Sequence, residues 1–357
     1  MFNFQRIVTL LMAMVFCLGT VGVAHAASDK VYNLNMTGGY MDRHPTVQNA
    51  FIPWAERIKQ RTNGKVVITY FNPNTLGPEG ENFELARKGQ IDIGHNHFAR
   101  NPGRLLVSSV GDIPTEFTHP PAFSVALWRM YNEIPEMQKE FEGLKVLAFH
   151  SSAPVQFDWV IDKNITNVAD VKGKKVLVAS GEQARMVRAM GGNPMIIPVT
   201  DYYLSLSRNM ADGCILPIAP LRSFKISEAL KSITVCSYSV AGWWIGMNQN
   251  TWNSLPKEYQ DIIMEESGEK LSYMGGRSIW DGDQVDVKFL QEQGVKMNVP
   301  SPEERAEWIR IATPAFKDEW FKKMSQRKLP AQDIYDKAYQ IRKDTAGIDV
   351  MPYSYTD

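Results

Sequence analysis

One stretch, residues 168–217, restricts the possible fold more than any other part of the chain. It reads VADVKGKKVLVASGEQARMVRAMGGNPMIIPVTDYYLSLSRNMADGCILP. Gly191-Gly192 can end a helix, because glycine readily adopts positive φ, and the Thr200 hydroxyl can cap the next helix. Strands that alternate with helices of about ten residues indicate a parallel sheet with helices on its faces. The expected strands and helices alternate in this order: 175–179, 182–190, 195–199, 201–210 and 214–216.

Ligands of such sheets bind beyond the carboxyl ends of the strands, where helix N-termini present backbone N–H groups. Four residues of this stretch take such positions: Ser180, Gly181, Thr200 and Leu216. The stretch therefore predicts a binding site before any other feature of the chain is considered.

The N-terminus has the pattern of a secretory signal peptide. Arg6 precedes an apolar run over residues 7–23, and the sequence AHAAS follows. Ala24 and Ala26 satisfy the small-residue rule at −3 and −1, so cleavage is expected after Ala26 and the mature protein is expected to be exported. A retained membrane anchor is the alternative, but no basic flank follows the run.

Charge and cysteine content exclude several classes of function. The chain has 39 Lys and Arg residues against 39 Asp and Glu residues, with no block of like charge. Binding to nucleic acid or to an anionic membrane therefore has no electrostatic support. Cys214 and Cys236 could form a disulfide in an exported protein or could be buried thiols, and neither belongs to a metal-binding pattern. No hydrolase or phosphate-binding motif is present.

The first half of the mature chain repeats the alternating pattern, and two helical segments, 252–268 and 270–293, follow the central stretch. Ser301 and Glu304 form a capping box that begins another helix. The expected fold is α/β, with two lobes, a cleft between them and a long connecting helix. The expected division is a signal peptide (1–26), lobe I (27–152, with 243–283 returning to it), lobe II (153–242, with 284–330 packing on it) and a C-terminal helical segment and tail (331–357).

Four segments, taken in order, resemble the solute-binding proteins of tripartite ATP-independent periplasmic (TRAP) transporters, DctP type. The resemblance covers nearly all of the mature chain. The segments are TNGKVVITYFNPNTLGPEGENFELARKGQIDIG (62–94), VADVKGKKV (168–176), MIIPVTDYYLSLSRNMADG (195–213) and MNQNTWNSLPKEYQDII (247–263).

The resemblance implies a periplasmic receptor that closes over a small solute, usually an organic acid. It also implies two partners, the small and large membrane permease components, and neither enzymatic activity nor a cofactor. A sensor or scaffold without a transport role remains an alternative.

The chain departs from the family pattern at the positions that the resemblance places at the ligand. The acid-binding arginine of the family falls on Leu177, and a second arginine of some members falls on Phe157. An asparagine falls on Leu216, and an aromatic residue falls on Val199. Bidentate Arg–carboxylate pairing is the strongest part of such sites, and a leucine at position 177 cannot form it. A neutral or cationic solute is therefore an alternative to a monocarboxylate.

The remaining candidates for ligand binding are aromatic or polar. Trp243 and Trp244 are adjacent on an expected strand, so at most one should face the cleft. Arg43 and Arg100 lie in loops that should face the cleft and could supply the cation that Leu177 lacks. His95 and His97 could bind a metal only with Glu79 or Glu81, so no metal site is expected. The complete expected ligand-binding set is Tyr40, Arg43, Glu79, His95, Arg100, Phe157, Trp159, Leu177, Ser180, Tyr203, Leu216, Trp243 and Asn248.

Overall fold

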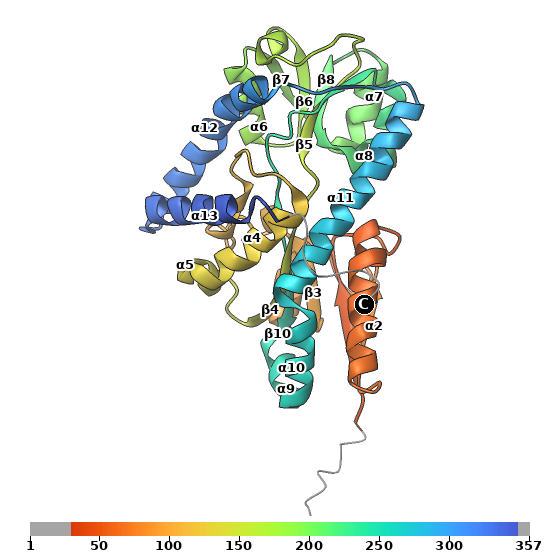
Figure 1. Ribbon diagram of the computed structural model, residues 1–357, viewed down its shortest axis with the longest axis vertical. Helices are drawn as coiled ribbons and strands as arrows, with labels where there is room; N and C mark the ends of the chain where they lie inside the picture. Colours follow the sequence, from red (N-terminus) through yellow and green to blue (C-terminus); the bar gives the residue numbers. More distant parts are fainter. Residues whose placement is uncertain (1–29, 349–357) are drawn as a thin grey trace, which may run out of the picture. The chain divides into compact units, whose positions relative to one another are not determined.

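A computed structural model describes residues 30–348, so the expected signal peptide and its cleavage site lie outside the described residues. The described chain contains a five-stranded sheet A, in the order β2-β1-β3-β10-β4, and a six-stranded sheet B, in the order β11-β9-β5-β8-β6-β7. Each sheet is the centre of one lobe (Figure 1). Within residues 30–348, no helix has the length and apolar character that a membrane span requires.

Sheet A has three parallel strands, β1, β2 and β3, and β10 runs antiparallel between β3 and β4. Because β4 is also antiparallel to β10, the carboxyl ends of β1, β3 and β4 lie at the same edge. The strands are β1 (Tyr32–Thr37), β2 (Val66–Phe71), β3 (Ile93–His97), β4 (Leu144–Ser151) and β10 (Gly242–Asn248).

Sheet B contains the central stretch of the sequence. Its strands β6, β7 and β8 are parallel, as expected, and β5 is antiparallel to β8 and β9. The strands are β5 (Val155–Trp159), β6 (Lys175–Val178), β7 (Asn193–Ile196), β8 (Gly213–Pro217), β9 (Ser232–Thr234) and β11 (Lys296–Asn298).

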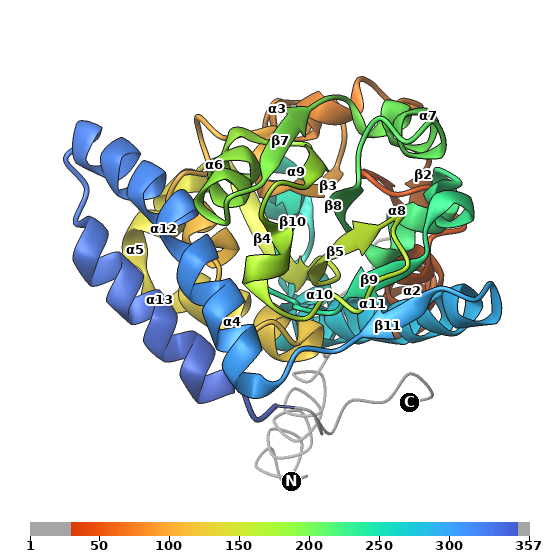
Figure 2. The same ribbon diagram turned by 90° about the horizontal axis from the view of Figure 1, so that it is seen from above.

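The chain passes between the sheets after β4, again between β9 and β10, and once more along α11. This helix spans 25 residues and packs on α4 and β4 of one lobe and on α8 of the other (Figures 1 and 2). The longer helices are α2 (Ile52–Arg61), α4 (Pro120–Glu133), α6 (Gly181–Ala189), α10 (Lys257–Glu266), α11 (Gly268–Glu292), α12 (Pro302–Gln326) and α13 (Ala331–Thr345). The shorter ones are α3 (Asn82–Arg87), α5 (Pro135–Glu140), α7 (Tyr202–Ser207), α8 (Ile218–Ser223) and α9 (Gln249–Ser254).

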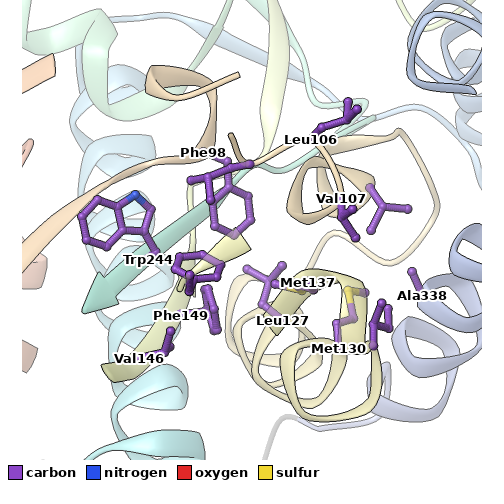
Figure 3. Close-up of a cluster of buried hydrophobic side chains, with 14 of the residues drawn as sticks. Phe98, Leu106, Val107, Leu127, Met130, Met137, Val146, Phe149, Trp244 and Ala338 are labelled. Carbon is purple, nitrogen blue, oxygen red and sulfur yellow. The ribbon is translucent and has the colours of Figure 1, made fainter. Parts of the chain in front are cut away.

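The C-terminal helix α13 belongs to the core of the lobe that contains sheet A. Ala338 of α13, Met130 of α4 and Trp244 of β10 are members of one buried cluster, in which Phe149 also packs (Figure 3). Burial of aromatic and aliphatic side chains of this size is worth about 1.5–3 kcal/mol each. The helix is therefore held by hydrophobic contact with α4.

One of the two predicted helix caps is confirmed and the other is wrong. Ser301 and Glu304 form the capping box of α12, as expected. The expectation that Thr200 caps a helix over 201–210 is wrong, because a short 3-10 turn (Val199–Asp201) precedes α7 and its N-cap, Asp201, has no side-chain cap bond. Residues 232–248 contain two strands in different lobes, because β9 belongs to sheet B and β10 to sheet A. The proposed domain boundaries stay a prediction.

Candidate functional site

A cluster of histidine and aromatic side chains occupies the edge of sheet A where β1, β3 and β4 end. His95 lies near the end of β3, His150 near the end of β4, and Trp243 at the start of β10, opposite both His97 and His150. Tyr40 follows β1 after two glycines. Four strands of different sequence position thus bring these rings together at the edge where α/β sheets bind ligands.

His95 and His150 form a direct imidazole pair with defined tautomers. The two Nε2 atoms are 2.8 Å apart, and His150 Nδ1 lies 2.9 Å from the Ser151 carbonyl oxygen. Because a carbonyl only accepts, His150 Nδ1 carries the proton and its Nε2 accepts from His95 Nε2–H. A neutral His95 then has an unprotonated Nδ1, which is buried without a hydrogen-bond partner and faces Gly38.

Aromatic rings stack around this pair. The Trp243 ring stacks on His95 at 5.0 Å and an interplanar angle of 19°, and on His150 at 5.8 Å and 11°. Tyr40 lies 4.4 Å from Trp243 and stacks on His44 at 3.7 Å. Trp244 points to the opposite face into the core, so the expectation that the two tryptophans face opposite sides is confirmed.

The histidines of this cluster are neutral. Burial lowers the pKa of His150 to about 3 and the pKa of His44 and His97 to about 4. Burial and the neighbouring His150 ring hold the pKa of His95 well below its usual range. The cluster therefore contributes flat, uncharged ring faces at neutral pH, and an anionic ligand would need its cation from elsewhere.

Charged groups stand at the rim of the same edge. Arg100 Nε lies 3.5 Å from Glu79 Oε1, and the Arg100 side chain is 58% exposed. A Cβ on Gly39 would lie 2.8 Å from the Trp243 ring and 3.2 Å from Glu79 Oε1, so the Trp243 ring and the Glu79 carboxylate both lie close to Gly39. The Arg43 side chain is exposed and forms no hydrogen bond or ion pair with residues 30–348. Trp243 Nε1 is buried without an acceptor.

The two histidines considered as metal ligands form hydrogen bonds within the protein. His95 Nε2 bonds to His150, and His97 Nδ1 accepts from the Ala99 amide at 2.9 Å. Within residues 30–348, no group of three or more His, Cys, Asp or Glu side chains could hold a metal ion.

The four apolar residues expected in the cleft are buried in sheet B instead. Leu177, Phe157 and Trp159 are fully buried, and Leu216 is 7% exposed. Alternation along each strand places Phe157 and Trp159 in one core cluster and Leu177 and Leu216 in the cluster on the other face. In this structure they form the interior of the lobe, and their expected role in ligand binding stays a prediction.

Three further candidates have bonding roles within the fold. Ser180 caps α6, because its Oγ accepts from the Gln183 amide at 3.2 Å. The half-buried Tyr203 donates its hydroxyl to Glu228. Asn248 caps α9 and donates to the Ala86 carbonyl. It ends β10, whereas Trp243 lies at the start of that strand, and its role in ligand binding stays a prediction.

Sheet B contains a buried acid that the sequence did not single out. Asp158 is fully buried, and burial raises its pKa well above the usual range, so the carboxyl is protonated. The Cys214 thiol donates to Asp158 Oδ2 at 3.6 Å, whereas Asp158 Oδ1 and the Tyr202 hydroxyl have no partner within the described residues. Cys214 and Cys236 are both free and buried, so the open question of a disulfide is answered for this structure.

Comparison with known proteins identifies the family. The model of the family described as "Bacterial extracellular solute-binding protein, family 7" (DctP) matches residues 38–323. The "Outer membrane transporter protein TsaT" of Comamonas testosteroni is 24% identical over 301 residues, 82% of this chain and 87% of that protein. A monocarboxylate 2-oxoacid-binding periplasmic protein of a Nostoc species is 26% identical over 227 residues, 58% of each chain.

A solved structure shares the fold. The TRAP solute-binding protein of Rhodoferax ferrireducens, crystallised with co-purified benzoate, has a TM-score of 0.77 and 22% identity, covering 90% of this chain and 100% of that chain. Because the family model matches most of the sequence and the two-lobed fold agrees with it, this chain belongs to the DctP family of extracellular solute-binding proteins, the solute-binding proteins of TRAP transporters.

Proposed function

We propose that this protein is a periplasmic receptor, exported by a signal peptide cleaved after Ala26, that delivers a small organic monocarboxylate to the small and large permease components of a TRAP transporter. The observation that carries this proposal is the cluster of stacked rings at the ligand edge of sheet A, with arginines at its rim. Monocarboxylates bound by relatives, a 2-oxoacid and benzoate, support the ligand class.

The rings favour a solute with a flat or apolar body. Tyr40 and Trp243 offer ring faces beside the neutral His95–His150 pair, and offset stacking of such faces contributes about 0.5–1.5 kcal/mol beyond area burial. The unpaired Trp243 Nε1–H is a hydrogen-bond donor for a solute oxygen.

The carboxylate charge would be met by arginine from the loops of lobe I. Leu177 is apolar and fully buried, so it supplies no charge. The Arg43 side chain has no partner among the described residues, whereas Arg100 would exchange its 3.5 Å contact with Glu79 for the solute. A single guanidinium matches one carboxylate, which disfavours dicarboxylates.

The test is isothermal titration of benzoate, pyruvate and succinate into the wild-type protein and into Arg43→Gln, Arg100→Gln and Arg188→Gln. Arg188 is an exposed residue in the last turn of α6 and serves as the matched control. We expect a monocarboxylate to bind in preference to succinate, with affinity lowered at least tenfold by Arg43→Gln or Arg100→Gln. A tenfold loss of affinity corresponds to about 1.4 kcal/mol. Tight succinate binding, or equal affinity in all three variants, would refute the proposal.

A cationic solute is the second candidate, favoured by the Glu79 carboxylate, which lies near Gly39 as the Trp243 ring does, and by the contact of that ring with Tyr40. Cation–π contacts of this kind contribute about 0.5–2 kcal/mol. Titration of choline distinguishes the two candidates, because Glu79→Gln should weaken choline binding and leave or improve carboxylate binding.

A further inference from the structure

A cavity lies between α4 and α13, apart from the edge of sheet A. Its volume is about 90 Å³, and Glu116, Phe117, His119, Ala122, Phe123 and Arg342 are among its lining residues. About 10–15 Å³ is enough for one water molecule, so this space admits several waters or one small organic group. None of these residues belongs to the ring cluster described above.

Arg342 is a buried cation in this cavity with unused hydrogen-bonding capacity. Its side chain is 2% exposed, and the terminal nitrogens donate to the carbonyls of Gly111, Ile113 and Phe117 at 2.9–3.0 Å. Its Nε–H has no acceptor. Burial lowers the pKa of Arg342 only to about 10, so the guanidinium stays charged at neutral pH.

No carboxylate of residues 30–348 lies within ion-pair distance of Arg342. The two acids that act on it electrostatically are Asp112 and Glu116. Asp112 accepts from the Gly242 amide, and the exposed Glu116 accepts from the Tyr339 hydroxyl at 2.6 Å. A buried guanidinium bonded only to neutral carbonyls is unusual, because buried charges are normally paired.

The first turn of α4 adds to the positive potential. Pro120 and Pro121 have no N–H, so the first backbone N–H of this 14-residue helix belongs to Ala122, which lines the cavity. Helix N-termini favour negative charge through the macrodipole. The Phe123 ring lies 4.7 Å from the Arg342 guanidinium carbon and provides an apolar wall.

We propose that this cavity binds the carboxylate group of a small aliphatic acid, with Arg342 Nε–H as its principal donor and the N-terminus of α4 beside it. A carboxylate matches this site because it is planar, accepts from a guanidinium and fits the available volume. The site is independent of the solute site proposed at the edge of sheet A, and neither proposal requires the other.

The experiment follows the Arg342 Nε–H signal in ¹H–¹⁵N spectra of the full-length protein during titration with sodium acetate, with sodium chloride at equal ionic strength as reference. Loss of the signal in Arg342→Lys assigns it. We expect a saturable shift with acetate and none with chloride. The affinity should be unchanged in Arg43→Gln, which alters only the solute site proposed at sheet A.

A second variant keeps the proposal testable if Arg342→Lys does not fold. Ala346→Leu fills the mouth of the cavity from an exposed position and leaves Arg342 in place, and Ala169→Leu at an exposed position of lobe II is its control. Acetate affinity should fall at least tenfold in Ala346→Leu and stay unchanged in Ala169→Leu. The absence of an acetate-specific shift, or equal affinity in these two variants, would overturn the proposal.

Discussion

Substitution of Gly38 by alanine tests the packing that holds the His95–His150 pair. A Cβ at Gly38 would lie 2.3 Å from His95 Nδ1, 2.9 Å from Cγ and 3.0 Å from Cβ of the same residue. No real contact is this short, and the imidazole cannot turn away because Phe51, Trp243 and His150 surround it. Overpacking of this kind costs about 1–3 kcal/mol.

The second contribution comes from the hydrogen bond. Displacement of His95 breaks the 2.8 Å contact with His150 Nε2, and both rings are fully buried. A buried polar group left without a partner costs about 1–3 kcal/mol. Gly38→Ala should therefore lower the free energy of unfolding by about 2–6 kcal/mol in total.

Urea unfolding followed by tryptophan fluorescence measures this difference, and Gly80→Ala is the matched control. Gly80 lies close to the same edge, but a Cβ there has no neighbour within 4 Å. The control should change stability by less than about 0.5 kcal/mol, as exposed substitutions usually do. If Gly38→Ala behaved like Gly80→Ala, the tight packing against His95 and the role of the imidazole pair would both be refuted.

Three further predictions concern ionisation. Because burial lowers the pKa of His150 to about 3, the unfolded chain binds a proton below pH ~6.5 that the folded chain does not. The free energy of unfolding should therefore fall on acidification by about 1.4 kcal/mol per pH unit for this group, and in urea unfolding His150→Gln should make this fall less steep between pH 7 and 5. Burial would raise the pKa of Glu266, but hydrogen bonds, with Arg57 first among the donors, outweigh it and lower this pKa to about 2. Glu266→Gln should therefore lower the free energy of unfolding by roughly 3 kcal/mol at pH 7 and by little near pH 2, where calorimetry should find the two proteins equally stable. Burial raises the pKa of the Cys214 and Cys236 thiols, so Ellman's reagent should label them only after unfolding, and rapid native labelling would contradict their burial.

Local sequence patterns predicted much of the fold because they report on neighbouring residues. The alternating apolar and helical segments of 168–217 correctly predicted parallel strands, and adjacency correctly assigned Trp243 and Trp244 to opposite faces. The capping box at Ser301 is likewise a contact between residues three positions apart. Such features depend on a few consecutive residues, which sequence shows directly.

Contacts between distant residues could not be predicted in the same way. His150 pairs with His95 across 55 positions, and no local pattern of the sequence connects the two residues. Asp158 interrupts an apolar strand, which marks it as unusual, but its partner Cys214 is 56 positions away. For Leu177, the alternation of side chains along a strand separates the two faces of the sheet, but it does not show which face the helices cover. Its burial could therefore not be predicted from this pattern.

The two lobes differ in how they could bind charge. The ring cluster of the lobe around sheet A is neutral because burial suppresses protonation of His95 and His150. On sheet B, the row formed by Leu177, Cys214 and Asp158 is buried and uncharged, since the Asp158 carboxyl keeps its proton. Among residues 30–348, charge beside the ring cluster comes from rim side chains such as Arg43 and Arg100. Rim side chains are exposed to solvent and screened by salt, so the ring faces should select the shape of the solute, while a rim arginine supplies the charge that a carboxylate needs.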